Sequence, residues 1–222
     1  MCKNLLKTTQ IFSQNSLFYN NLFKKICKKI RNRNKTIVIR DIGLLIVSSV
    51  QTLVIYGAMQ LNYLYKCINK SWNNIISFYN IRPQSDYFVG FDRSAFTKKQ
   101  LKKLKFFVNK IDFKTFIYFI VTTQIYFSFF ICKIKYNAAA LNVADRQNIY
   151  SITVAIRVFV ELFRSIKRKK EFNQKILVFS ILYNYISARI YSYYSVIEED
   201  KTIFYCYLIY KFDFTALDSK KK

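Results

Sequence analysis

The stretch IGLLIVSSVQTLVIYGAMQLNYLY, residues Ile42–Tyr65, runs for 24 residues without a charge. As an α-helix that rises about 1.5 Å per residue, it is long enough to cross the roughly 30 Å hydrocarbon core of a bilayer. Tyr63 and Tyr65 lie at one end, as aromatic residues at a membrane interface do. Gln51 and Gln60 are unfavourable in contact with lipid, so the stretch predicts a transmembrane helix that packs against partner helices.

Two further apolar runs predict additional spans. Residues 115–132 carry no charge and have the length of a minimal span, although their β-branched and aromatic content also suits buried strands. Residues 176–197 carry one charge, Arg189. In a membrane this side chain is expected to face protein or water, as a functional intramembrane charge or a structural ion pair. The alternative is that 176–197 form a soluble helix.

Glycine and proline are scarce, with three glycines and one proline in the chain. Tight hairpin turns depend on these residues, so long helices are favoured over a hairpin-rich sandwich or barrel. The expected fold class is all-α: a polytopic membrane protein with about three transmembrane helices plus basic amphipathic helices. Around the spans we expect an N-terminal basic arm (1–41), a connection (66–114) with an amphipathic helix (97–111), a second amphipathic helix (138–170) and a polar tail (198–222).

The charge balance requires an anionic partner. Thirty-seven Lys and Arg residues face 12 Asp and Glu residues, which gives a net charge of +25. A protein with this charge repels itself unless it lies on a polyanion, such as nucleic acid or an anionic lipid surface. The helix over 97–111 begins with the capping-box spacing Thr97-x-x-Gln100, and its polar face is wholly cationic. The predicted lipid or phosphate contacts are Lys98, Lys99, Lys102, Lys103, Lys105 and Lys110 on this helix, and Lys24, Lys25, Lys28 and Lys29 in the N-terminal arm.

Residue types that carry chemistry are mostly missing. The chain has no histidine, which excludes His-based metal sites and acid–base mechanisms. Its five cysteines are scattered without metal-ligand spacing, and its three glycines cannot form a phosphate loop. Adjacent side chains in Glu198-Glu199-Asp200 point apart, which makes a poor metal site. We therefore expect no cofactor, no metal and no catalysis by this chain alone.

Residue usage favours Lys, Asn, Ile, Phe and Tyr, as translation from an AT-rich genome does. In composition the chain resembles fast-evolving, mitochondrially encoded membrane subunits of protist respiratory or ATP-synthase complexes, those of ciliates among them. The resemblance implies a non-catalytic accessory subunit in the mitochondrial inner membrane. Its implied partners are the other subunits of a large membrane complex and an anionic, cardiolipin-like phospholipid.

The alternative function is that of an organellar ribosomal protein in the mitochondrial matrix. The basic arm and the lysine face over 97–111 would then bind ribosomal RNA through its phosphates. Aromatic residues interleaved with these cations would stack on bases. Three long runs with few or no charges favour the membrane, whereas the charge of +25 suits either partner.

Overall fold

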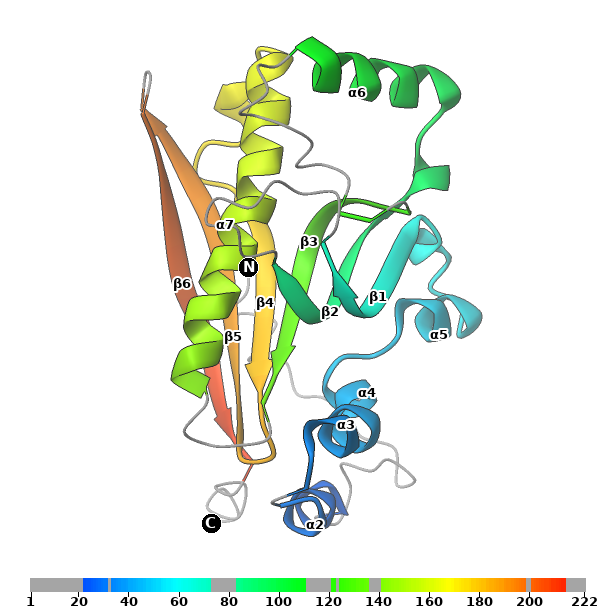
Figure 1. Cartoon of the computed structure of the whole chain (residues 1–222), viewed down its shortest axis with the longest axis vertical. Coiled ribbons are helices and arrows are strands. Elements are labelled where there is room, and N and C mark those ends of the chain that lie inside the picture. The colour runs from blue at the N-terminus through cyan, green and yellow to red at the C-terminus, as the bar shows by residue number, and fades with distance from the viewer. Residues whose placement is uncertain are drawn as a thin grey trace.

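A computed structural model shows a six-stranded sheet with helices on both faces (Figure 1). It describes residues 22–31, 33–72, 83–110, 121–122, 124–135, 141–198 and 201–214, without the side chains of 105–110, 141 and 142. The strands are β1 (Leu64–Ser71), β2 (Gln84–Asp92), β3 (Ile125–Ile134), β4 (Ile176–Tyr183), β5 (Ser187–Glu198) and β6 (Lys201–Asp213). The expected all-α membrane fold is therefore wrong.

Helical segments precede, interrupt and cover this sheet. The α-helices are α2 (Leu22–Lys29), α3 (Lys35–Val38), α4 (Leu44–Ile46), α5 (Val50–Ile55), α6 (Lys98–Lys110) and α7 (Leu141–Ser165). Shorter segments are the π-helix η2 (Ile39–Gly43) and the 3-10 helices η3 (Met59–Leu61), η4 (Arg93–Ala95) and η7 (Lys169–Glu171). The α6 and α7 helices lie inside the ranges for which amphipathic helices are predicted.

The strands follow one another across the sheet in sequence order, β1 to β6. Every neighbouring pair is antiparallel except β3 and β4, which are parallel. A parallel pair needs a long crossover connection, and α7 lies within it. The helix packs along one face of the sheet against β3, β4 and β5.

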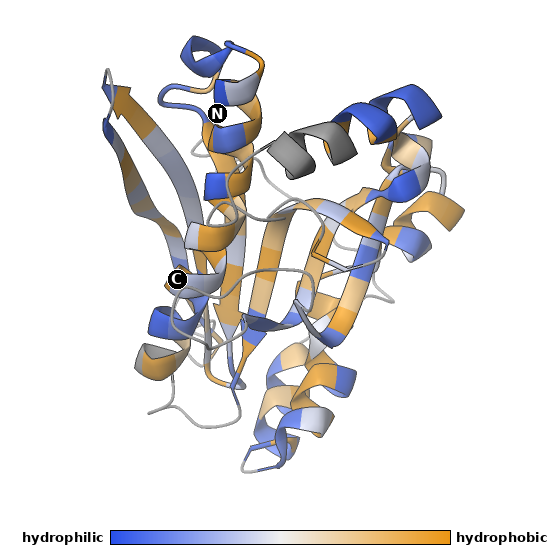
Figure 2. Ribbon diagram, turned by 45° about the horizontal axis from the view of Figure 1, so that its top comes forward, coloured by the Kyte–Doolittle hydropathy of each residue, from blue (hydrophilic) through white to orange (hydrophobic). Residues whose placement is uncertain are grey.

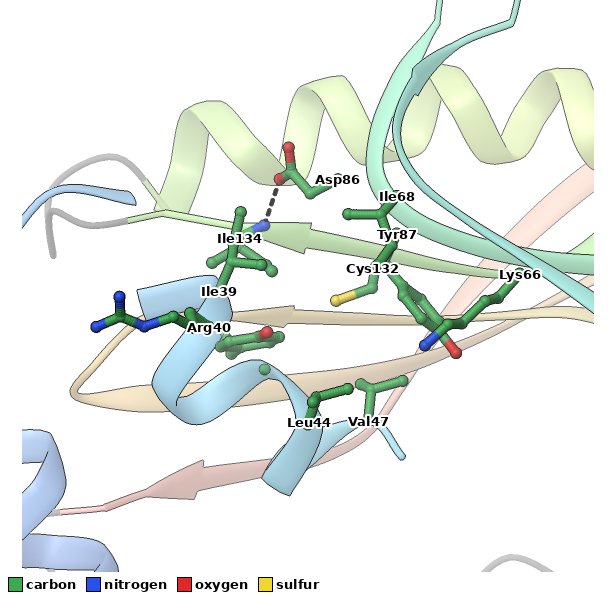
Figure 3. A pocket seen from close by; sticks show the side chains of 12 residues that line it. Ile39, Arg40, Leu44, Val47, Lys66, Ile68, Asp86, Tyr87, Cys132 and Ile134 are labelled. Atoms are coloured by element: carbon green, nitrogen blue, oxygen red, sulfur yellow. Dashed lines mark hydrogen bonds between the residues drawn. The ribbon is translucent and has the colours of Figure 1, made fainter. Parts of the chain in front are cut away.

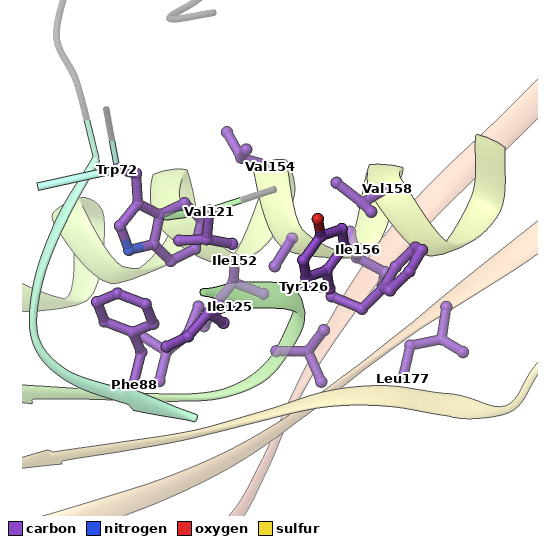
Figure 4. Packing of buried hydrophobic residues seen from close by; sticks show 14 of the residues in the cluster. Trp72, Phe88, Val121, Ile125, Tyr126, Ile152, Val154, Ile156, Val158 and Leu177 are labelled. Carbon is purple, nitrogen blue, oxygen red and sulfur yellow. The ribbon is translucent and has the colours of Figure 1, made fainter. Parts of the chain in front are cut away.

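The sheet separates two hydrophobic clusters. On the α7 face, Ile152 and Ile156 of the helix meet Phe88, Ile125 and Leu177 of the strands (Figure 4). On the other face, apolar residues of the N-terminal helices pack against β2, β3 and β4. Central strands covered on both faces read as nearly continuous apolar runs. Because these strands are buried on both faces, their sequences resemble those of membrane spans.

The run Ile42–Tyr65 does not form one helix. The chain is extended at Val47 (φ −129°, ψ 95°), and Ser49 begins a new helix by accepting a hydrogen bond from the Thr52 amide. A turn at Gly57 (φ +98°) then leads towards β1. By length and composition, Lys35–Ile55 is the single candidate span in the described part of the chain, and 28% of its apolar window is buried. The break at 47–49 divides this candidate.

The other two predicted spans are also corrected. Within 115–132, residues 115–120 lie outside the description, and Ile125–Cys132 belong to β3. Within 176–197, Asn184 divides the run into β4 and β5. Its side-chain oxygen accepts hydrogen bonds from the amides of Ile186 and Ser187, both 2.8 Å long. An asparagine can thus close a tight turn in a run without glycine or proline.

Candidate nucleic-acid interface

The first two turns of α6 place four predicted lysines in solvent. The predicted capping box is confirmed, because the Thr97 amide donates to Gln100 Oε1 (2.8 Å) and the Gln100 amide donates to Thr97 Oγ1 (3.3 Å). Lys98, Lys99, Lys102 and Lys103 are exposed, whereas Leu104 is buried in the α7-side cluster. Figure 2 shows the hydrophilic start of this helix. The side chains of Lys105 and Lys110 lie outside the described residues.

A groove of about 510 Å³ opens beside the start of α6. We call it the aromatic groove. Its volume lies within the range of small-ligand sites, about 300–1,000 Å³. Seven of its ten lining residues are aromatic, and they come from positions far apart in the chain. The lining residues are Tyr63, Phe91, Ala95, Phe96, Gln100, Phe127, Phe159, Leu162, Phe163 and Phe172.

A bulge between β2 and β3 forms the floor of the groove. Val89 pairs with Phe130 and Phe91 pairs with Tyr126, so a single β2 residue faces three residues of β3. Within the bulge Phe127 has a φ of 50°, which is uncommon for a bulky residue. Its ring packs near those of Phe96 and Phe159, with centroids 6.0 and 5.7 Å away. Bulges and unusual backbone conformations of this kind are frequent at functional sites.

Gly90 is required by this bulge. A Cβ atom at position 90 would lie 2.5 Å from Ile125 Cγ2 and 2.7 Å from the Tyr126 carbonyl oxygen. We expect Gly90→Ala to lower the free energy of unfolding by about 1–3 kcal/mol through overpacking, as measured by urea denaturation. Adding Ile125→Val should not restore stability, because the Tyr126 carbonyl belongs to the backbone. A free energy unchanged in Gly90→Ala would contradict the bulge.

The turn after α7 adds cations to the opposite side of the groove. Lys167 adopts a left-handed conformation (φ 58°), and the Arg168 amide donates to the Phe163 carbonyl (2.8 Å), as in a Schellman cap. This reversal returns the chain so that Phe172 packs against Phe163. Lys167 and Lys170 are exposed on the turn. We call the following six residues the basic rim: Lys98, Lys99, Lys102, Lys103, Lys167 and Lys170.

The composition of the groove suits binding rather than bond-breaking chemistry. None of its ten lining residues is an acid, a lysine, an arginine or a cysteine. Among the described residues, no ion pair includes a basic-rim lysine, and the five pairs found there involve Lys35 or arginines. Apolar ring faces beside uncompensated cations are the combination that single-stranded nucleic acids require.

A second, apolar cavity of about 230 Å³ lies between the N-terminal helices and the sheet (Figure 3). Cys132, Tyr87 and Tyr183 line it, and burial raises the pKa of all three groups. The thiol and both phenols are therefore protonated at neutral pH. Burial also lowers the pKa of the Lys66 ammonium at this cavity. A protonated thiol is a poor nucleophile, so this cavity is a weak candidate for catalysis.

Asp86 organises the polar end of this cavity. Its side chain is 4% exposed, and it accepts hydrogen bonds from Lys35 Nζ and from the Ile134 amide (2.7 Å), the bond drawn in Figure 3. Buried Lys133 donates from its Nζ to the Gln84 carbonyl (2.5 Å). Desolvation lowers the pKa of Lys133, and the nearby Asp86 carboxylate opposes that shift. The cluster is a structural ion network where β2 begins and β3 ends.

Arg189 has a structural position in this fold. It lies on β5 and donates to Asp145 Oδ2 of α7 (2.5 Å). Tyr191 donates to the other oxygen of the same carboxylate (3.0 Å). The predicted intramembrane charge is therefore one half of an ion pair between α7 and the sheet.

The four predicted N-terminal lysines all lie on α2. Lys25, Lys28 and Lys29 are exposed and Lys24 is partly buried, whereas Phe23 and Cys27 point into the core. Burial raises the pKa of the Cys27 thiol to about 11. In Figure 1, α2 and α6 lie at opposite ends of the long axis. The fold therefore separates the ten predicted cations into two groups.

Sequence reasoning did not find the aromatic groove, because its walls meet only after folding. Its one local signal is Gly90, which is among three glycines in the chain. In the described segments no group of three His, Cys, Asp or Glu residues could hold a metal ion.

Comparison with known proteins identifies the family. Residues 22–222 match a family model described as a domain of unknown function (DUF7924), so the chain belongs to that family. No curated protein and no solved structure is significantly similar to the chain. The family description assigns no activity, so the functional argument depends on the geometry of the chain itself.

Proposed function

We propose that this chain is a nucleic-acid-binding protein without catalytic activity of its own. Bases of a single strand stack on the rings of the aromatic groove, while the basic rim neutralises the phosphates. The observation that carries the proposal is the position of a seven-ring groove between the start of α6 and the cationic turn after α7. Base–aromatic stacking contributes about 1–3 kcal/mol per base and tolerates any sequence.

An anionic lipid surface suits α6 less well. Interfacial helices bind lipid by burying a free apolar face among the headgroups. In this fold Leu104 is buried in the protein core, and Leu101 packs against the same cluster. Over 98–104, the part of α6 whose side chains the structure describes, the exposed residues are four lysines and Gln100, which favours a solvated polyanion over a bilayer. A nucleic-acid strand binds lysines through its phosphates and does not require an apolar helix face to be inserted.

The two functions expected from the sequence now have unequal support. The membrane-subunit function depended on three spans, and the described residues of those runs form strands and an interrupted helix. We do not retain it. Binding to ribosomal RNA agrees with the groove and its rim, and unpaired segments of such an RNA are one ligand of the proposed class.

Tyr63→Ala provides the test, because Tyr63 lines the groove and its side chain is 58% exposed. We expect the substitution to weaken binding to a fluorescent single-stranded oligonucleotide about 5- to 150-fold, the loss of one stacked base. Tyr63→Phe should retain most of the affinity. Fluorescence anisotropy of the full chain at a fixed salt concentration provides the measurement.

Tyr56→Ala is the matched control. Tyr56 is 83% exposed and lies nearby in sequence, but it does not line the groove. Its removal should leave the affinity within twofold of the parent chain. Equal losses at positions 56 and 63, or no loss at either, would count against stacking in the aromatic groove.

A further inference from the structure

The α2 helix packs on the body of the protein through a stripe of buried apolar residues. Phe23, Cys27 and Ile30 are about 5% exposed, and the Phe23 ring meets Phe214 edge-on with centroids 5.1 Å apart. The stripe fixes the helix on the body of the protein. Its basic residues consequently project along both sides and over the outer surface.

Two basic depressions flank this helix. The first, of about 170 Å³, has an apolar floor that includes Phe214 and is lined by Lys24, Lys28 and Arg31. The second, of about 520 Å³, is lined by three further cations and one acid: Lys29, Arg33, Arg40 and Asp41. Asp41 pairs with Arg40. Each side of α2 therefore presents a row of cations.

We propose that α2 is a separate binding site for duplex DNA, with the helix directed into the major groove. A helix about 10–12 Å across fits a groove about 12 Å wide, and eight residues span about 12 Å of its length. The two rows of cations then face the phosphates of opposite strands. The major groove of A-form RNA is too narrow to admit a helix, so the geometry selects DNA over duplex RNA.

Lipid is a less suitable partner for this helix. A membrane-surface helix must insert its apolar face, but Phe23 and Cys27 of α2 are buried and Ile26 is partly buried. Leu22, 40% exposed at the start of the helix, is the one apolar residue of α2 left in solvent. Cations beside so little exposed apolar surface favour a phosphate backbone over a bilayer.

The two ends of the molecule would then have different ligands. The α2 site lies at the opposite end of the long axis from α6 and the basic rim (Figure 1). This step, unlike the α2 site itself, rests on the proposed single-strand function. With both sites, one chain can bind a duplex and an unpaired strand at the same time. DNA that contains both, such as a duplex with a single-stranded extension, is the substrate class that uses both sites.

Lys28→Ala together with Lys29→Ala tests the α2 site, because the two exposed lysines belong to different depressions. In a salt titration, the slope of log affinity for a DNA duplex against log salt should fall in magnitude by about 1.8. The parent chain should bind DNA more tightly than a duplex RNA of the same sequence, and the substitutions should remove that preference. Affinity for a single-stranded oligonucleotide should stay within twofold.

Lys201→Ala with Lys211→Ala, two exposed lysines on β6, is the matched control and should leave the DNA slope nearly unchanged. An unchanged slope in the α2 variant overturns this inference, and so does equal binding of DNA and RNA duplexes. Loss of binding to cardiolipin-containing vesicles, with DNA binding intact, would assign α2 to lipid instead. Because Tyr63→Ala tests the groove independently, failure of one proposal is distinguishable from failure of the other.

Discussion

Replacing Asp86 with alanine is expected to lower the free energy of unfolding by about 3–5 kcal/mol. The carboxylate is almost fully buried and serves both Lys35 Nζ and the Ile134 amide. Its removal leaves the buried Lys133 without the compensating charge that opposes its desolvation. Breaking a buried ion pair at one partner is costly because an uncompensated charge remains. Urea denaturation followed by circular dichroism provides the measurement.

Two comparisons isolate this effect. Asp41→Ala removes the carboxylate of an exposed pair with Arg40, and it should change stability little because solvent screens such pairs. Adding Lys133→Met to Asp86→Ala should recover part of the lost stability, since replacing both charges with apolar groups is often neutral. If Asp86→Ala were as stable as Asp41→Ala, the buried network described between β2 and β3 would be incorrect.

The second large effect is expected on α6. Changing Lys98, Lys99, Lys102 and Lys103 to alanine should reduce the magnitude of the salt slope for single-strand binding by about 3, because each phosphate contact contributes about 0.7. At 0.1 M salt this corresponds to an affinity loss on the order of 10²- to 10³-fold. The four lysines are exposed, so folding should be unaffected. Anisotropy titrations at several salt concentrations provide both numbers.

The same four positions changed to arginine form the control. Arginine keeps the positive charge, so the salt slope should remain that of the parent chain. A slope that is unchanged in the alanine variant would mean that α6 does not contact phosphates. A slope that falls in the arginine variant would mean that the geometry of the lysines, rather than their charge, determines binding.

The sequence predicted some helices correctly in position because their signals are local. The Thr97-x-x-Gln100 box marks the start of α6, and α7 follows a helical spacing of apolar residues. The apolar runs over 115–132 and 176–197 were misread because burial on both faces removes the alternation that marks a strand. The run Ile42–Tyr65 was misread because its break at Val47–Ser49 contains no glycine or proline. Asn184 replaces the expected glycine or proline at the β4–β5 turn, so the break in 176–197 was not recognised.

The candidate site, too, could be predicted from the sequence only in part. Its lysines are visible in sequence, because six lie in one short helical segment without an acid on the same face. The aromatic groove is not visible, since Tyr63, Phe127 and Phe172 come together only through the β2–β3 bulge and the reversal after α7. A left-handed Phe127 and a left-handed Lys167 have no sequence signature, because residues of these types rarely adopt that conformation.

Photo-crosslinking tests the central claim, single-strand binding in the aromatic groove, most directly. A single-stranded oligonucleotide that carries 4-thiouracil is bound to the full chain and irradiated, and mass spectrometry then identifies the attached residues. We predict attachment at Tyr63 and in the segments 91–96 and 163–172, which form the groove. Attachment confined to the exposed tyrosines of β6 (Tyr205, Tyr207 and Tyr210), or no attachment to the folded chain, would contradict the account.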